Sequence, residues 1–292
     1  MADPAAINTY LICKAAREKN IIVLLNGMGG DEVFSGYRAH LACLKADAFQ
    51  QYVPGFMQNP LANVISNLPE ATKSRNLKYI RWIKSFMAIA SLPQFERSLA
   101  VKNSALTSDT FKNYYKNAPV QFEHSHHYKT EKQLFEAYNT DYLTQMCVND
   151  TSIYMPDHNL TYTDKASMAA SVECRPPLID HRIVEFLFTL PPHLRIRKNV
   201  QKYVLKKVSE KYIPNEIIYR PKAPFSAPMR GWLKNELAEI VNDTLSVQAM
   251  HKRGIYNASF VQKLIVNNQK GLEDNSQLIF RLLVNELWFK TF

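Results

Sequence analysis

The chain has 292 residues, of which 46% are hydrophobic, and it carries 36 Lys plus Arg against 26 Asp plus Glu, a net charge of +10. This length and apolar content suit one large domain or two smaller ones and exclude an intrinsically disordered protein. The positive charge is scattered, without a dense basic run, a zinc-finger spacing or an aromatic RNA-binding motif. The sequence therefore does not predict a nucleic-acid partner.

The cysteine pattern and the hydropathy indicate in which cellular compartment the protein is expected. The four cysteines are Cys13, Cys43, Cys147 and Cys174, and no two of them form a CxxC pair. Each lies in an apolar or helical stretch, where cysteine behaves as a small hydrophobic residue. No signal peptide opens the chain, and no apolar run approaches the ~20 residues of a membrane helix. We therefore expect a soluble, cytoplasmic protein with no membrane partner.

The first residues predict a helix followed by a strand. Pro4 to Asn20 has an amphipathic pattern, with a proline in its first turn and basic residues at its end. The run Ile21 to Leu25 is entirely apolar and predicts one clear core strand, covered on both faces as in a parallel α/β sheet. A single strand cannot pair its own backbone groups. Its neighbours are therefore expected from a preceding part of the domain or from another polypeptide.

After this strand the pattern is almost entirely helical. A helix is expected over Asp31 to Ala46, and the last expected helix is Ser276 to Phe292. Prolines such as Pro156 are expected to separate the helices between them. The chain is therefore predicted to be mostly α-helical.

A glycine-rich segment, "NGMGGDEVFSGY" (Asn26 to Tyr37), directly follows the strand. A strand, a glycine-rich turn and a helix start let main-chain N–H groups face a phosphate or a nucleotide. Asp31 and Glu32 are then expected at the N-terminus of the helix. They are either simple caps favoured by the helix dipole, or Asp31 holds a Mg²⁺ ion that bridges nucleotide phosphates.

Two further segments concentrate charged residues. Asp157 to Phe186 surrounds a small-residue stretch, "SMAAS", with Asp164, Lys165, Glu173, Arg175 and Asp180. These charges form either a buried network that ties helices together or the support of a site. In Tyr219 to Leu233, Lys222 is flanked by prolines and aromatic residues. Such a lysine is commonly solvent-exposed, but a rigid loop also positions its charge to stabilise phosphate oxygens during adenylyl transfer.

These three segments resemble, in this order, the signature segments of the synthetase domain of glutamine-dependent asparagine synthetases. The intervening stretch Leu190 to Val208 is similar to the same family's segment, with Lys202 at its recurrent lysine. The resemblance implies an α/β fold, in which a parallel sheet of the adenine nucleotide alpha hydrolase type carries a helical lobe. It also implies that residues 1–292 are the C-terminal part of one such domain, with residues 1–46 from the nucleotide-binding core and residues 47–292 from the helical lobe.

The family adenylates a carboxylate with ATP and Mg²⁺, and ammonia then displaces AMP to give an amide. By position, the resemblance implies that the nucleotide site is lined by Asn26, Gly27, Met28, Gly29 and Gly30. Asp31 is expected to bind Mg²⁺, and Lys202 and Lys222 are expected to be catalytic, contacting pyrophosphate and the acyl-adenylate. The residues expected to support the site are Glu32, Asp164, Glu173, Arg175 and Asp180.

The chain also departs from the family pattern. It contains neither the pyrophosphate loop of the type S-G-G-x-D-S nor an N-terminal nucleophilic cysteine with a glutaminase domain. We therefore expect the isolated chain to be inactive, with a missing N-terminal region or a partner chain supplying the loop. Met28 stands where these synthetases usually have a glutamate, and a methionine cannot accept a proton. Asn26 replaces the usual serine.

These departures leave three possibilities for the function. In the first, the chain belongs to an amide-forming ligase of the asparagine synthetase type, whose acceptor carboxylate is aspartate or an analogue of it. In the second, it is a relative that amidates a different carboxylate or sugar acid in a biosynthetic cluster. A third possibility is a non-catalytic, decayed paralogue, a helical module that binds a partner strand through the unpaired edges beside Ile21 to Leu25.

Overall fold

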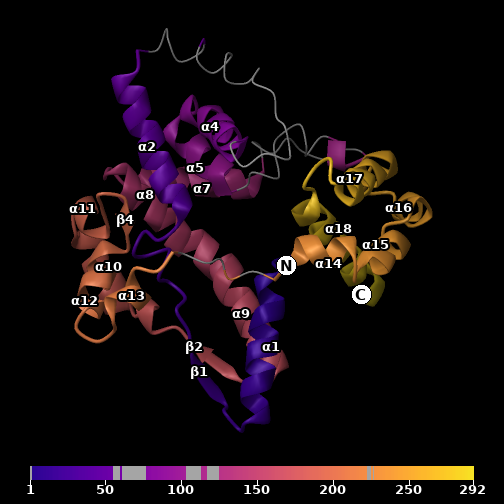
Figure 1. Cartoon of the computed structure of the whole chain (residues 1–292), viewed down its shortest axis with the longest axis horizontal. Helices are drawn as coiled ribbons and strands as arrows, with labels where there is room; N and C mark the ends of the chain where they lie inside the picture. Colours follow the sequence, from indigo (N-terminus) through magenta and orange to yellow (C-terminus); the bar gives the residue numbers. More distant parts are fainter. Residues whose placement is uncertain are drawn as a thin grey trace.

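The structure is a computed structural model, and it describes residues 2–54, 60, 77–102, 113–116, 125–221, 225 and 227–292. These residues are mostly helical, as the sequence predicts, and their strands are short. Figure 1 shows an N-terminal arm that contains two strands, a group of helices next to it, and a separate C-terminal group of helices.

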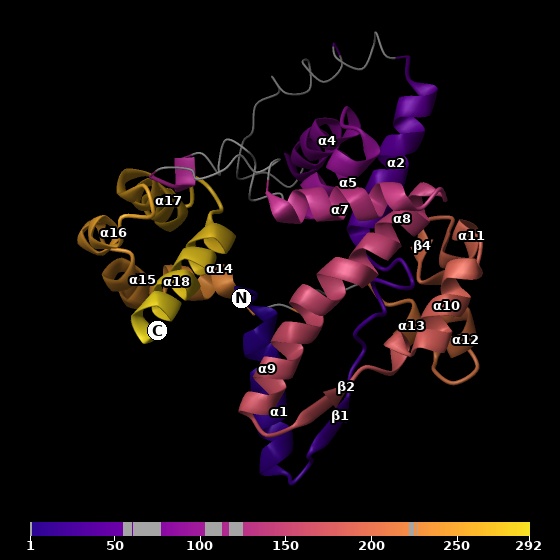
Figure 2. The ribbon, with the colours of Figure 1, turned by 180° about the vertical axis from the view of Figure 1, so that it is seen from behind.

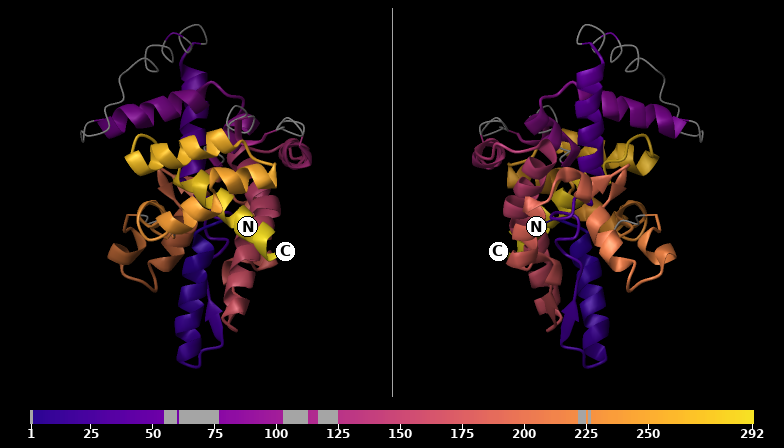
Figure 3. Two further views of the ribbon diagram at one scale, coloured as in Figure 1. Left: turned by 90° about the vertical axis from the view of Figure 1, so that its right-hand side faces the viewer. Right: turned by 90° about the vertical axis from the view of Figure 1, so that its left-hand side faces the viewer.

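The arm is built around a parallel strand pair. Strand β1 (Val23–Leu25) pairs with β2 (Glu173–Arg175), with Leu24 opposite Cys174. Helix α1 (Ala5–Glu18) precedes β1, helix α9 (Thr161–Ala169) precedes β2, and the two helices pack against each other beside the strands, as Figures 2 and 3 show. The helix expected over residues 4–20 is therefore present.

The expectations for the strand were correct in position but wrong in two respects. The run was expected to be covered on both faces, yet Ile22 is 57% exposed and Leu25 is 74% exposed. The partner strand was expected from outside the chain, yet β2 lies within it, in residues for which the sequence pattern predicted no strand. Within the described residues this sheet has two strands, and its exposed apolar side chains show that the run is not covered as a strand inside a parallel sheet would be.

A continuous helical segment connects the arm to the neighbouring helices. Helix α8 (Tyr142–Asn149) runs into a π-helix, η2 (Asp150–Leu160), which runs into α9. Pro156 lies inside η2, so the helix break expected at this proline is absent. A π-helix has i to i+5 hydrogen bonding, and this wider winding accommodates a residue that has no N–H group.

The helices next to the arm share one core. They are α2 (Arg38–Tyr52), α5 (Gln94–Lys102), α7 (His126–Ala137) and α8. Helix α4 (Leu77–Ala90) packs against α2 and α5. Phe95, Phe135 and Met146 are buried in this core. The buried guanidinium of Arg97 donates hydrogen bonds to the carbonyls of Cys43 and Leu92, which satisfies part of its hydrogen-bonding capacity away from water.

Short elements follow β2. They are η3 (Pro177–Ile179), α10 (His181–Thr189), α11 (Pro192–Arg195), β3 (Ile196–Arg197), β4 (Val200–Gln201), α12 (Tyr203–Ser209) and α13 (Asn215–Ile218). Strands β3 and β4 pair in antiparallel fashion and turn the chain toward α12. This turn positions Lys202, the residue directly before α12.

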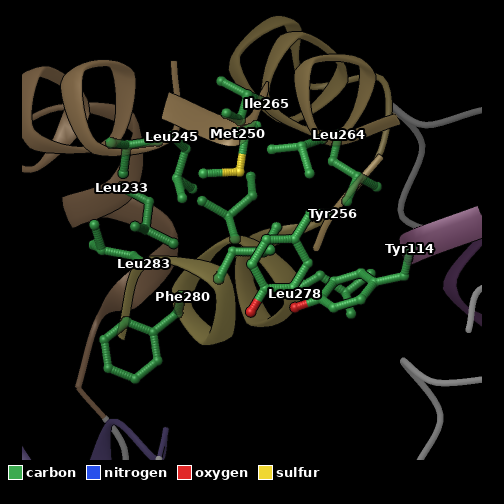
Figure 4. Close-up of a cluster of buried hydrophobic side chains, with 14 of the residues drawn as sticks. Tyr114, Leu233, Leu245, Met250, Tyr256, Leu264, Ile265, Leu278, Phe280 and Leu283 are labelled. Carbon is green, nitrogen blue, oxygen red and sulfur yellow. The ribbon is translucent and has the colours of Figure 1, made fainter. Parts of the chain in front are cut away.

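The C-terminal helices enclose a separate apolar core, shown in Figure 4. They are α14 (Met229–Lys234), α15 (Ala238–Thr244), α16 (Val247–Arg253), α17 (Ala258–Lys270) and α18 (Ser276–Thr291). Leu282 of α18 and Val261 of α17 are fully buried there. The last helix therefore lies where the sequence predicts it. None of the helices in the described ranges combines the length and the hydropathy needed to span a bilayer.

Candidate functional site

The glycine-rich loop begins at the carboxyl end of the parallel strand pair. The backbone N–H of Asn26 donates a 3.0 Å hydrogen bond to the carbonyl of Arg175, which continues the ladder for one more residue. The side-chain oxygen of Asn26 accepts a 3.1 Å hydrogen bond from the N–H of Met28, and the N–H of Gly30 donates to the carbonyl of Gly27 at 3.2 Å. The five residues expected to line a nucleotide site therefore form one compact set of turns.

Two glycines are required by close approach of other residues. Gly29 has φ +84°, and a Cβ atom there would lie 2.2 Å from Cγ2 of Ile179. A Cβ atom on Gly36 would lie 2.0 Å from Oδ1 of Asp31 and 2.1 Å from Cε of Lys202. Any larger residue at either position has to displace one of these neighbours, so the glycines allow the loop to close around the Asp31–Lys202 contact.

Asp31 and Lys202, two residues expected in the site from distant parts of the chain, form an ion pair. The Lys202 Nζ atom lies 3.0 Å from Asp31 Oδ1, and the two side chains are 27% and 26% exposed. Lys202 has a left-handed backbone, with φ 55°, at the N-terminal boundary of α12. This conformation is uncommon for a lysine, and it occurs at the residue that brings the second half of the chain to the loop.

The relation of Asp31 to the following helix differs from the expectation. Helix α2 begins at Arg38, and residues 28–35 form turns instead of the first turns of a helix. Positive φ angles at Gly29 and at Ser35, where φ is 60°, interrupt a continuous right-handed helix. The interpretation of Asp31 and Glu32 as simple helix caps is therefore wrong, because no helix starts at them.

Glu32 is buried and holds the loop against the π-helix. Its carboxylate accepts hydrogen bonds from the hydroxyl of Tyr37 and from the side-chain amide of Asn159 in η2. Burial, and then the nearby charge of Glu32, raise the pKa of Tyr37 well above its ordinary value, so the hydroxyl stays a donor. Tyr37 and Asn159 were not identified from the sequence as site residues, although both lie inside the quoted segments.

The side chains of the other expected supporting residues make contacts that do not include Asp31 or Lys202. Asp164 is exposed in the first turn of α9. Glu173 and Arg175 are exposed and bind each other, with a 2.8 Å hydrogen bond from Arg175 Nε to Glu173 Oε1. Asp180 caps α10 and binds the guanidinium of Arg182, which holds the pKa of this carboxyl below its usual range. Glu173, Arg175 and Asp180 thus form local pairs at the surface instead of the buried network considered for them.

A second group of buried charges lies beside Tyr37, whose ring contacts that of His40. The carboxylate of Asp150 binds Nε2 of His40 at 2.7 Å and also Lys102, and these contacts hold its pKa below the ordinary value although burial alone raises it. Glu131 lies next to this group and binds His127 at 3.3 Å. Burial raises the pKa of Glu131. This group lines a cavity of about 760 Å³, whose described lining includes none of the predicted site residues.

Asp31 offers an oxygen ligand of the kind that Mg²⁺ takes. Mg²⁺ is commonly held by one or two carboxylates together with substrate phosphates, and Asp31 presents a partly exposed carboxylate directly after the glycine-rich turn. Within the described residues no group of three or more His, Cys, Asp and Glu side chains is placed to hold a metal by itself. Lys222, the second expected catalytic lysine, lies outside the described residues.

Comparisons with known proteins place these features in a family. The sequence model described as asparagine synthase matches residues 1–290. Asparagine synthetase [glutamine-hydrolyzing] 1 of Bacillus subtilis (strain 168) is 27% identical over 291 residues, which cover 99% of this chain and 43% of that protein. A putative asparagine synthetase [glutamine-hydrolyzing] of Mycobacterium tuberculosis (strain ATCC 25618 / H37Rv) is 27% identical over 294 residues, which cover 100% of this chain and 42% of that protein.

A third relative matches a shorter part of the chain at higher sequence identity. Asparagine synthetase [glutamine-hydrolyzing] 3 of Bacillus subtilis (strain 168) is 40% identical over 62 residues, which cover 21% of this chain and 10% of that protein. The chain spans less than half the length of the two long relatives that it matches from end to end. No solved structure matches the chain. Because the family model covers almost every residue, the chain belongs to the asparagine synthase family.

Proposed function

We propose that this chain forms part of the ATP site of an amide-forming ligase, which adenylates a carboxylate and then replaces AMP with ammonia. The observation that supports this most directly is the 3.0 Å contact between Lys202 and Asp31 at the mouth of the glycine-rich loop. In this proposal the lysine and the carboxylate, which neutralise each other in the structure, separate when the nucleotide binds, one toward phosphate oxygens and the other toward a metal ion. Family membership supports the same assignment.

Each residue has a distinct role in this proposal. The turns from Asn26 to Gly30 receive the nucleotide, Asp31 holds Mg²⁺, and Lys202 contacts the pyrophosphate oxygens. When bound, Mg²⁺ neutralises negative charge on the phosphates. The ammonium of Lys202 stabilises the charge that grows on the leaving pyrophosphate. Lys222 is proposed to act in the same way on the acyl-adenylate.

The wider assignments are part of the same proposal. Strands β1 and β2 belong to a parallel sheet of the adenine nucleotide alpha hydrolase type, and their parallel pairing with exposed apolar side chains supports this. The remaining pyrophosphate contacts come from a loop outside residues 1–292 or from a partner chain. The acceptor is aspartate or an analogue, and Met28 favours a carboxylate other than aspartate. We propose a cytoplasmic location, in keeping with cysteines that are free in the structure.

Titration of the chain with MgATP tests the nucleotide site. Lys202→Ala removes one charge-assisted hydrogen bond, worth about 1.5–3 kcal/mol, so the dissociation constant is expected to rise about tenfold to 100-fold. The matched control is Lys207→Ala in α12, the helix that follows Lys202, because Lys207 forms an exposed 2.8 Å ion pair with Glu210. Equal affinities of the two variants for MgATP would show that Lys202 does not contribute to nucleotide binding.

A second function is favoured by the exposed side of the strand pair. Ile21, Ile22, Val23 and Leu25 are all exposed, and within the described residues β1 pairs with β2 on one edge only. An unpaired strand edge is a template for another strand. In this alternative the chain is a non-catalytic module that binds a partner polypeptide. It predicts that Leu25→Lys abolishes partner binding and that Lys202→Ala binds MgATP no more weakly than Lys207→Ala. The ligase proposal predicts weaker MgATP binding by Lys202→Ala.

A further inference from the structure

Two cysteines that the proposed chemistry does not use lie in contact with each other. The Sγ atoms of Cys13 in α1 and Cys174 in β2 are 3.7 Å apart, although 161 positions separate them in the sequence. The packing of α1 against α9 and the pairing of β2 with β1 bring them together. The other two cysteines, Cys43 and Cys147, are buried in the helical core and belong to a different cluster.

We propose that Cys13 and Cys174 form an oxidative modification site, at which a low-molecular-weight disulfide such as oxidised glutathione converts the two thiols into an intramolecular disulfide. A disulfide is about 2.05 Å long, so the two sulfur atoms need to approach by less than the width of one atom. Side-chain rotation in the two residues supplies this movement without separating α1 from the strands.

The two thiols differ in access, which sets the order of the steps. Cys174 is partly exposed, whereas Cys13 is buried in the face of α1 that packs on α9. Burial, followed by the hydrogen bond and charge of Cys174, raises the pKa of Cys13 to about 11. Because the thiolate is the attacking species, Cys174 is the first thiol to react with an external disulfide, and Cys13 is the second.

The reaction balances with the disulfide as oxidant. The Cys174 thiolate attacks one sulfur of the external disulfide, whose S–S bond breaks, and one thiolate leaves and takes up a proton. Cys13 then loses its proton, and its thiolate attacks the Cys174 sulfur and expels the second external thiolate. Two protein thiols are oxidised, and one external disulfide is reduced to two thiols.

The cross-link has a mechanical consequence for the loop. Arg175, the residue after Cys174, accepts the backbone hydrogen bond of Asn26 at the start of the glycine-rich loop. A bond from Cys174 to α1 therefore tethers the base of that loop to the N-terminal helix. It also closes a long segment of chain, which stabilises the folded state by restricting the unfolded one. The oxidised protein is expected to melt at a higher temperature than the reduced protein.

The test is oxidation of the chain with oxidised glutathione, followed by acid quenching, alkylation under denaturing conditions, and intact and peptide mass spectrometry. We expect two of the four thiols to escape alkylation, the protein mass to fall by two hydrogens, and one peptide to link residue 13 to residue 174. Reduction with dithiothreitol is expected to restore all four thiols. Full alkylation after oxidation, or a link through Cys43 or Cys147, would overturn the proposal.

Three variants separate the steps. Cys174→Ala is expected to resist modification, whereas Cys13→Ala is expected to retain one glutathionyl group on Cys174. The matched control, Cys43→Ala, is expected to form the same disulfide as the wild type. Only the wild type and Cys43→Ala are expected to show a higher melting temperature after oxidation. A glutathionyl group on Cys13 in Cys174→Ala, or equal melting temperatures before and after oxidation, would contradict the proposal even if one variant failed to fold.

Discussion

The hydroxyl of Tyr37 donates a hydrogen bond to the buried carboxylate of Glu32, and Asn159 donates a second one. The carboxylate is thereby satisfied from two sides, one within its own loop and one from the π-helix. This contact fixes the position of the loop that also carries Asp31.

Removal of the Tyr37 hydroxyl tests the importance of this contact for stability. Tyr37→Phe leaves a buried carboxylate with one donor fewer, and we expect a loss of about 1–3 kcal/mol in the free energy of unfolding. Urea unfolding followed by circular dichroism measures the change. Tyr52→Phe is the control, because Tyr52 is 84% exposed. Similar stability of the two variants would show that the Tyr37 hydroxyl contributes nothing.

A side chain at Gly36 is expected to disrupt the Asp31–Lys202 pair. In Gly36→Ala the new methyl group meets both members of the pair, and overpacking of this kind costs about 1–3 kcal/mol. The affinity for MgATP is expected to fall together with stability. Gly231→Ala is the control, since no atom lies within 4 Å of a Cβ at that position in α14. Its stability is expected to stay the same or to rise.

Replacement of Asp31 by asparagine tests the metal assignment. Asp31→Asn keeps the shape of the side chain but removes the charge that would offset Mg²⁺. We expect ATP affinity measured at low Mg²⁺ to fall steeply and to recover partly as Mg²⁺ is raised. Glu210→Gln, which breaks the exposed pair with Lys207, is the control. An Asp31→Asn variant with wild-type ATP affinity at every Mg²⁺ concentration would refute the metal role.

Glu131 gives a prediction for pH. Its folded-state pKa is raised above its ordinary value of 4.5, mainly by burial and against the charges of Lys102 and His127. An acid with a raised pKa destabilises the folded state while it is ionised, and this destabilisation disappears as the pH falls through the folded pKa toward 4.5. Glu131→Gln is therefore expected to be more stable than wild type at pH 7, with the difference closing in acid.

Thermal unfolding at a series of pH values measures this difference. Glu136→Gln in the same helix is the matched control, because its carboxylate is 61% exposed and pairs only loosely with Lys132, at 3.9 Å. We expect no pH-dependent gain for this control. A constant difference between Glu131→Gln and wild type from pH 7 to pH 4 would show that the ionisation of Glu131 does not affect stability.

The sequence alone predicted the elements with strong local signals. The helix that begins after Pro4, the final helix and the glycine-rich loop are where the patterns place them. The family resemblance assigned Asp31 and Lys202 to one site, but their ion pair was not predicted, because nothing local connects a loop to a lysine so far along the chain. The division at residue 46 and the catalytic roles remain predictions.

The errors have physical causes. Strand β2 has three residues, too few for an alternating pattern to distinguish it from a helix end. A continuous apolar run such as Ile21 to Leu25 predicts burial on both faces, but it does not say whether the covering layers lie within the same chain. The burial of Glu32 depends on Tyr37 and Asn159, and only the folded chain brings Asn159 to the loop.

The π-helix has a consequence for which side chains reach the loop. An α-helix turns by about 100° per residue, so Asp150 and Asn159 would point in opposite directions from a regular helix. With i to i+5 hydrogen bonds and about 4.4 residues per turn, the two residues come almost into the same angular phase. Asp150 binds His40 and Asn159 binds Glu32, on either side of Tyr37. The π-helical winding of this segment therefore determines the direction in which both side chains point. A one-residue deletion that restored α-helical geometry would rotate one of them away from its partner.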